Sequence, residues 1–168
     1  MIIKLHENFT NESASRVVEE LRACVDLGVP EITISIDSNG GYVSALQAIV
    51  DTIKWCRKRK VKVNTYNAGK AYSCGVSLLS FGDKRTMAPT AQSMIHDVGV
   101  QELGGGKVGD LEQRVKELRE FNEVWMGFLA KNMKMSRKKL EKLVKGQDLF
   151  LSAEESLELG VVDGIDFL

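Results

Sequence analysis

Residues 67–82 read NAGKAYSCGVSLLSFG, and the character of the sequence changes at Ser73. Glycines and polar residues typical of a turn come before this serine, and an apolar run typical of a short helix follows it. A strand that enters a helix through such a turn leaves backbone amides unpaired above the sheet. Such amides can hold a phosphate or stabilise a developing oxyanion. Ser73 therefore fits a helix cap, a packing residue or a nucleophile.

Strands and helices alternate on both sides of this stretch. Residues 32–37 and 61–66 alternate apolar and polar side chains, as strands do, whereas residues 43–53 carry an apolar stripe at helical spacing. Further strands are predicted at residues 2–5, 84–87, 92–96 and from residue 161, and further helices at residues 11–27, 111–133, 136–144 and 152–160. The last helix opens with Ser152 and Glu155 at the spacing of a capping box. This order predicts a single α/β domain over residues 1–168 with largely parallel strand pairing.

The charge balance argues against nucleic-acid and membrane partners. The 23 Lys and Arg residues equal the 23 Asp and Glu residues, so no overall field attracts a polyanion. Residues 57–60 (RKRK) are basic, but they follow a helical segment, where cations interact favourably with the carboxyl-end dipole. No apolar run approaches the roughly 20 residues that span a bilayer.

The cysteines indicate a reducing compartment. Cys24, Cys56 and Cys74 are widely spaced and include no Cys-x-x-Cys pair. This pattern fits neither a disulfide framework nor a zinc site. The first residues lack the long apolar stretch of a signal peptide. We therefore expect a cytoplasmic protein that binds no metal.

A nucleophilic serine needs a base, and the chain has two histidines. Residues 71–75, with Ala at the first position and Gly at the last, match half of a Gly-x-Ser-x-Gly elbow around Ser73. His6 lies at the end of the first predicted strand without polar company, which favours a structural or surface role. His96 ends a predicted strand and can reach a neighbouring turn, but a surface histidine at a loop start fits the spacing equally well.

A third group must orient that histidine and stabilise its charged form. Periodicity does not choose among the candidate aspartates, which are Asp97, Asp110, Asp148, Asp163 and Asp166. The glycine turn at residues 38–41 offers further amides, but it matches neither a dinucleotide fingerprint nor a P-loop. The residues by themselves give little support to a nucleotide site and leave the triad incomplete.

Four blocks of sequence resemble, in order, the proteolytic subunits of the Clp protease family. They are residues 38–41 (SNGG), 69–75 (GKAYSCG), Pro89 with 93–96 (SMIH), and 148–155 (DLFLSAEE). The similarity extends from residue 2 to residue 165. It implies the ClpP/crotonase-type α/β fold of repeated strand-strand-helix units, with a protruding handle at about residues 99–132. It also implies a serine endopeptidase that forms a homo-oligomer of stacked rings and cleaves peptides or unfolded proteins inside the chamber.

The resemblance assigns roles to individual residues. Ser73 matches the nucleophile, His96 the general base and Asp148 the orienting acid. Gly41 and Cys74 match the residues whose backbone amides form the oxyanion hole. For the handle, the resemblance implies a strand that binds substrate and a helix that joins two rings. No cofactor or metal is implied for this chemistry.

Several positions depart from the family pattern. Asn39 stands where proline is usual, and Lys70 and Tyr72 replace small or neutral residues. Asp97 directly follows His96 and is a competing partner for it, and residues 104–106 (GGG) enlarge the handle loop. The chain also begins at the first core strand, as in short phage-type members that lack an N-terminal axial segment. We therefore expect poor coupling to an ATP-driven unfoldase.

Other classes of function remain open at this level. A crotonase-type acyl-CoA enzyme shares the fold, but it does not need Ser73, His96 and Asp148 together. A Ser-Lys dyad would use Lys70, which fits a solvated charge better. A non-catalytic ring-forming scaffold or modulator is the third alternative, and the intact set of three residues disfavours it.

Overall fold

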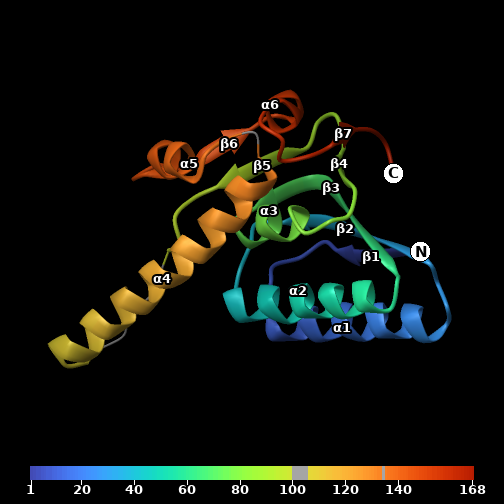
Figure 1. The fold of residues 1–168 in the computed structure, drawn as a ribbon, viewed down its shortest axis with the longest axis horizontal. Coiled ribbons are helices and arrows are strands. Elements are labelled where there is room, and N and C mark those ends of the chain that lie inside the picture. Colours follow the sequence, from blue (N-terminus) through green and yellow to red (C-terminus); the bar gives the residue numbers. More distant parts are fainter. Residues whose placement is uncertain (100–105, 134) are drawn as a thin grey trace.

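The structure is a computed structural model that describes residues 1–99, 106–133 and 135–168. Helices and strands alternate through most of these residues (Figure 1). The strands are β1 (Ile2–Leu5), β2 (Glu31–Ser38), β3 (Lys62–Tyr72), β4 (Arg85–Met87), β5 (Gln92–Ile95), β6 (Leu149–Leu151) and β7 (Gly164–Ile165). The helices are α1 (Asn11–Asp26), α2 (Val43–Lys58), α3 (Cys74–Leu79), α4 (Val108–Asn132), α5 (Arg137–Val144) and α6 (Ala153–Glu158).

The strands form one mostly parallel sheet. Its main order is β1-β2-β3-β4-β7, and every neighbouring pair along this path is parallel. Strand β5 pairs in parallel with the end of β3, and β6 then pairs antiparallel with β5. The predicted α/β class with largely parallel pairing is confirmed. The branch through β5 and β6 brings residues far apart in sequence to the end of β3.

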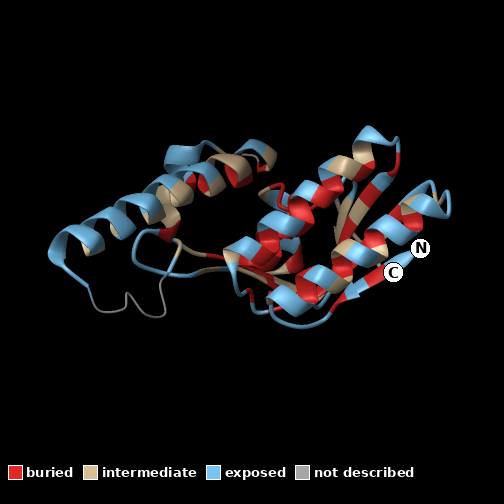
Figure 2. Cartoon of the chain, turned by 90° about the horizontal axis from the view of Figure 1, so that it is seen from below, coloured by how far each residue is buried: buried red, intermediate tan, exposed pale blue. Residues whose placement is uncertain are grey.

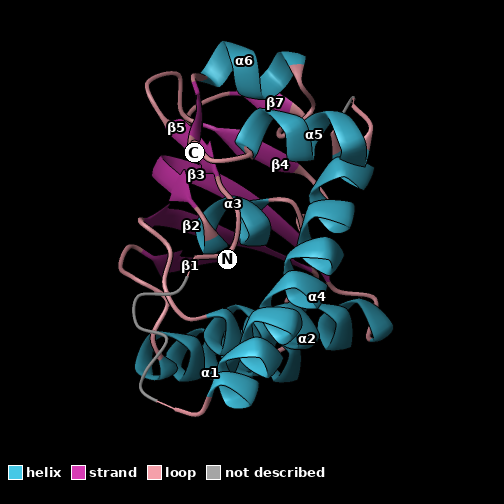
Figure 3. Cartoon of the chain, turned by 90° about the vertical axis from the view of Figure 1, so that its left-hand side faces the viewer, coloured by secondary structure: helices cyan, strands magenta, loops and turns pink. Residues whose placement is uncertain are grey.

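Helices α1 and α2 lie side by side along one face of the sheet (Figures 1 and 3). The isoleucines of β2, at positions 32, 34 and 36, are fully buried, as are Leu21 of α1 and Ile49 of α2. Complete burial of a side chain of this size contributes roughly 2 kcal/mol. In Figure 2, buried residues recur along both helices, whereas most of α4 away from its carboxyl end is exposed.

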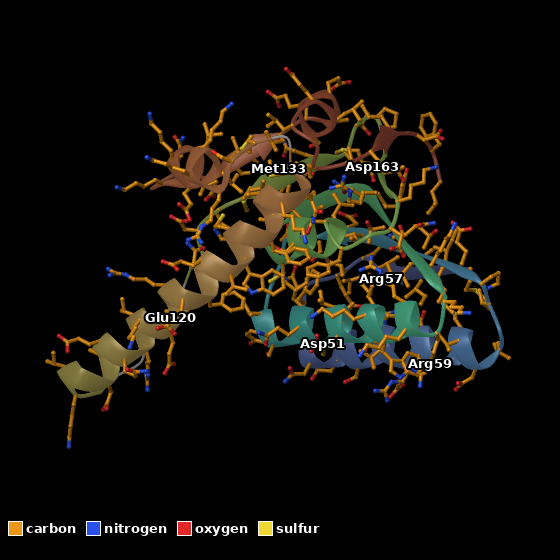
Figure 4. All side chains as sticks on the ribbon, in the orientation of Figure 1. Asp51, Arg57, Arg59, Glu120, Met133 and Asp163 are labelled. Atoms are coloured by element: carbon orange, nitrogen blue, oxygen red, sulfur yellow. The ribbon has the colours of Figure 1, made fainter. Side chains whose placement is uncertain are left out.

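The ends of the helices carry the capping residues that the sequence indicates. At α6 the Ser152 hydroxyl accepts from the Glu155 amide at 3.2 Å, and the Ser152 amide donates to the Glu155 carboxylate at 2.8 Å. The predicted capping box is confirmed. The basic run lies at the carboxyl end of α2, where Arg57 pairs with Asp83 at 2.9 Å and Arg59 covers the Trp55 ring at 3.9 Å (Figure 4).

The structure differs from the prediction most clearly at three strands, β3, β6 and β7. β3 continues to Tyr72 instead of ending at Tyr66, because side chains pair its irregular second half: Asn67 Nδ2 donates to Gln92 O at 3.0 Å, and Asp37 accepts from the Lys70 amide at 3.1 Å. The short strand β6 was not predicted. The final strand begins at Gly164, whereas Val161 and Val162 are buried in the turn that precedes it.

Helix α4 projects from the body of the domain and is anchored at its carboxyl end (Figures 1 and 4). Phe128 is half-buried and stacks on Phe81 with ring centroids 3.9 Å apart, whereas Met133 is buried. The predicted substrate-binding strand of the handle lies largely outside the described residues, and so does most of the 104–106 glycine run. None of the helices in the described ranges is long and apolar enough to cross a membrane.

Candidate active site

Ser73 occupies a sharp turn between β3 and α3. Its backbone has φ 55° and ψ −115°, and a positive φ is uncommon for any residue with a side chain. The Ser73 amide donates to Met94 O at 3.0 Å, which ties the turn to β5. Ser73 is the N-cap residue of α3, but its side chain makes no capping hydrogen bond. The helix-cap interpretation of this serine therefore fails, and its hydroxyl is directed elsewhere.

The partner of that hydroxyl is His96. The His96 Nε2 atom lies 2.7 Å from the Ser73 Oγ atom. Strand pairing explains the contact, because Tyr72 of β3 is in register with Met94 of β5, and each chain then continues past the sheet edge. Ser73 and His96 thus emerge from neighbouring parallel strands at the same edge. This short contact is the geometry in which a histidine can take a proton from a serine.

Asp148 approaches the other side of the same imidazole ring. Its Oδ1 atom is 3.8 Å from His96 Nδ1, and its side chain is 52% exposed. The antiparallel register pairs Ile95 with Leu149, so one further step places Asp148 opposite His96. An edge contact between the Tyr72 and Phe150 rings, with centroids 5.6 Å apart, packs β6 against the end of β3. The separation of 3.8 Å is that of an ion pair, longer than a hydrogen bond.

The other candidate aspartates have partners elsewhere. Asp97 accepts from Asn122 Nδ2 at 3.1 Å, and Asp163 pairs with Arg85. Asp110 accepts from the Lys107 amide at 3.3 Å, and Asp166 accepts from its neighbouring amide at 2.8 Å. Within the described part of the chain, Asp148 is the carboxylate that the fold brings to the ring of His96.

The glycine turn after β2 lies directly against Ser73. Gly40 has φ +103°, and a Cβ atom there would lie 2.7 Å from the Ser73 Cβ atom. Gly41 has φ +143°, and a Cβ atom there would meet Phe9 O at 2.4 Å. Neither position accepts a side chain without displacing the backbone. The two glycines therefore allow this turn to approach the serine closely.

Cys74 joins the two turns. Its thiol donates to Gly41 O at 3.3 Å, and burial raises the pKa of the Cys74 thiol to about 11. The sulfur is therefore a neutral thiol at pH 7 and does not compete with Ser73 as a nucleophile. In the described ranges, the backbone amides of Gly41 and Cys74 donate to no protein acceptor. These two donors are therefore unpaired in turns that border Ser73.

A cavity of about 570 Å³ opens beside Ser73 and His96. Its lining includes residues of α2 and α3, and α4 contributes Leu118, Phe121 and Trp125. The cavity thus combines a largely apolar lining with a serine and a histidine, as ligand pockets commonly do. No group of three or more His, Cys, Asp or Glu residues in the described ranges is arranged to hold a metal ion.

The structure also bears on the predictions for Lys70 and His6. Lys70 Nζ donates to Asn39 Oδ1 at 3.1 Å, and His96 occupies the hydroxyl of Ser73, so the geometry gives a Ser-Lys dyad no support. His6 is exposed and contacts Ser35 Oγ at 2.9 Å, so it has a polar partner that was not predicted, and it fits the predicted structural or surface role. Sequence reasoning missed Asn122, because nothing in the pattern of a long helix marks a polar side chain that reaches back to residue 97.

Comparisons with known proteins agree on one family. A family model described as Clp protease matches residues 1–167. Two curated proteins of Tropheryma whipplei, ATP-dependent Clp protease proteolytic subunit 1 (strain Twist) and subunit 2 (strain TW08/27), are each 33% identical over 137 residues. The match covers 80% of this chain and 64% of each relative, so the chain spans less than two thirds of these relatives' length.

Proposed function

The chain belongs to the Clp protease family, and on this premise we propose that it is a serine endopeptidase with Ser73 as its nucleophile. The observation that carries the proposal is the 2.7 Å contact between Ser73 Oγ and His96 Nε2 at a strained turn. Backbone strain of this kind persists where function requires a side chain in one position. The family match favours this reaction over the acyl-CoA chemistry that shares the fold.

His96 and Asp148 act on the proton of Ser73. For Nε2 to accept that proton, the proton of the neutral ring must sit on Nδ1, which faces Asp148. His96 then removes the Ser73 proton during attack on the peptide carbonyl and returns it to the leaving amine. Asp148 holds the tautomer and stabilises the imidazolium. This requires the 3.8 Å separation to shorten toward about 2.9 Å, as catalytic hydrogen bonds often do when substrate binds.

The amides of Gly41 and Cys74 stabilise the tetrahedral intermediate. Both belong to turns that border Ser73, and the Cys74 thiol fixes the Gly41 carbonyl. Two preformed donors aimed at the developing oxyanion require no reorganisation during the reaction. Loss of one such donor typically costs about 3 kcal/mol of transition-state stabilisation.

The substrates that fit this site are peptides and unfolded polypeptides. The cavity beside Ser73 accommodates side chains rather than a folded domain, and the rings of Phe121 and Trp125 offer apolar contact to them. An extended chain can place a carbonyl at Ser73 and an apolar side chain in the cavity. Small fluorogenic peptides with an apolar residue before the reporter group are therefore suitable test substrates.

A fluorophosphonate probe tests the proposal without knowledge of the natural substrate. We expect covalent labelling of the native protein, and peptide mapping by mass spectrometry should place the label on Ser73. Heat-denatured protein is the control, since labelling depends on activation by His96. A label on another residue would contradict the assignment, and an unlabelled protein that still forms rings would support the scaffold alternative.

We propose that the chain assembles into a homo-oligomer of stacked rings that encloses the sites. The buried residues of α4 are Met126, Leu129 and Ala130, all near its anchored end. Toward its projecting end, Val108 is 72% exposed, and Leu111, Val115 and Leu118 on the same side of the helix are partly exposed. A projecting helix with an incompletely covered apolar side is best stabilised by a second copy.

We expect a particle of at least six subunits in light scattering at micromolar concentration. Ser73→Ala should assemble equally well, because Ser73 lies in the turn between β3 and α3 and not on α4. A monomer under these conditions, for the native chain and for the variant, would refute the assembly.

A further inference from the structure

Among the described residues, one side chain of helix α4, that of Asn122, holds the segment after His96. The Val98 amide donates to Asn122 Oδ1 at 3.0 Å, and Asn122 Nδ2 donates to Asp97 Oδ1 at 3.1 Å. Asn122 is half-buried and lines the cavity beside Ser73. One amide group thus contacts the two residues that directly follow the proposed general base.

No other hydrogen bond supports this segment within the described ranges. Strand β5 ends at Ile95, so His96 begins a stretch without sheet pairing. Asp97 and Val98 have no further hydrogen-bond partners among the residues that the structure describes. The ring of His96 must nevertheless stay at 2.7 Å from Ser73. Within the described residues, the Asn122 amide is therefore the contact that orients the backbone after His96.

The same contact also occupies the carboxylate nearest to His96 in sequence. Asp97 would otherwise be a second anionic partner for the imidazole, in competition with Asp148. A carboxylate only accepts hydrogen bonds, a backbone amide only donates them, and an asparagine side chain does both. Asn122 satisfies both groups with its two ends. Neither an acid nor an apolar residue at this position can do so.

We propose that Asn122 is a positioning residue that acts through His96. It fixes the backbone of residues 97 and 98 and holds the Asp97 carboxylate on α4, so that Nδ1 of His96 is left to Asp148. The effect of Asn122 on turnover rests on the proposed peptidase function. Its effect on the position of the His96 imidazole does not depend on that function. A small misplacement of a catalytic group lowers turnover by about tenfold to a hundredfold.

A reciprocal exchange of the two side chains tests the pair. Asn122→Asp sets two carboxylates against each other, and we expect kcat for a small peptide to fall at least about tenfold with little change in KM. Asp97→Asn alone should keep near-native kcat, because its side-chain oxygen still accepts from Asn122. The double variant Asn122→Asp with Asp97→Asn restores one donor and one acceptor, and it should recover most of the lost kcat.

A spectroscopic readout separates this role from general stability and from activity itself. The chain has two histidines, so nitrogen-15 ring signals of His96 can be assigned by comparison with His6→Gln. We expect the His96 ring signals to shift in Asn122→Asp and to return in the double variant, with folded protein confirmed by thermal unfolding.

Several outcomes would overturn the inference. They are unchanged His96 signals with native kcat in Asn122→Asp, a rise in KM alone, which would make Asn122 a substrate contact, or a double variant that is not rescued. If the native protein neither cleaves peptides nor reacts with the probe, the proposed function has failed. The His96 ring signals then still decide whether Asn122 positions the ring.

Discussion

Ser73→Ala is expected to reduce kcat for peptide cleavage by about a millionfold, to the limit of detection, while the protein stays folded. The serine hydroxyl is the group that His96 Nε2 contacts, and the neighbouring Cys74 thiol is neutral at pH 7 and buried. The hydroxyl caps no helix, so its removal costs one hydrogen bond, about 1 kcal/mol. Steady-state kinetics with a fluorogenic peptide and thermal unfolding measure the two effects separately.

Ser80→Ala is the matched control. Ser80 is the C-cap residue of α3, the helix that follows Ser73. Its hydroxyl is buried, donates to Ser77 O at 2.7 Å and lies outside the cavity lining. We expect this variant to lose stability to a similar or greater extent and to keep its kcat. Purified Ser73→Ala that cleaves the peptide at the native rate would exclude Ser73 as the nucleophile.

Ser73→Gly adds a second comparison at the same position. The φ of 55° at Ser73 strains any residue with a Cβ atom, at a cost of order 1–3 kcal/mol. Glycine adopts this conformation freely, which offsets its greater entropy loss on folding. Ser73→Gly should therefore be as inactive as Ser73→Ala. Its free energy of unfolding should exceed that of Ser73→Ala by about 1 kcal/mol. An inactive but more stable variant would indicate that the strain is retained for the hydroxyl.

The long, strongly patterned elements were predictable from the sequence. β2 alternates buried isoleucines with polar residues, and α1 and α2 repeat apolar residues at helical spacing, so a local pattern reports which face is buried. β6 could not be found this way, because three residues are too short to show a period. The second half of β3 has the composition of a turn. Its pairing depends on Asp37 and Gln92, which are distant in sequence, so a local pattern does not indicate a strand there.

Part of the candidate site could also be predicted from the sequence, because some of its residues lie in locally recognisable turns and strand ends. The turn chemistry around Ser73 and the strand end at His96 are local features, so both were candidates before any fold was known. The choice of aspartate was not local. Asp148 reaches His96 through the antiparallel register of β5 and β6, and Asp97 turns away through a contact with α4. Spacing along the chain carries no information about either, and the resemblance alone singled out Asp148.

Asp148→Asn is the variant that tests this choice. We expect kcat to fall by about 10⁴-fold, because an amide cannot stabilise the imidazolium and can hold the wrong tautomer of His96. The free energy of unfolding should change little, since the Asp148 side chain is 52% exposed and its ion pair spans 3.8 Å. A large loss of turnover without a loss of stability would mark a group that acts in the transition state.

Asp97→Asn is the control for Asp148→Asn, because it makes the same chemical change one residue from His96. Its oxygen can still accept from Asn122 Nδ2, so the segment after His96 should keep its position and kcat should stay within a fewfold of native. Measured side by side, the two variants decide which carboxylate serves the imidazole. If Asp97→Asn were inactive and Asp148→Asn near native, the pairing of His96 with Asp148 would be wrong. The 3.8 Å separation would then be a surface ion pair rather than a catalytic contact that closes on substrate.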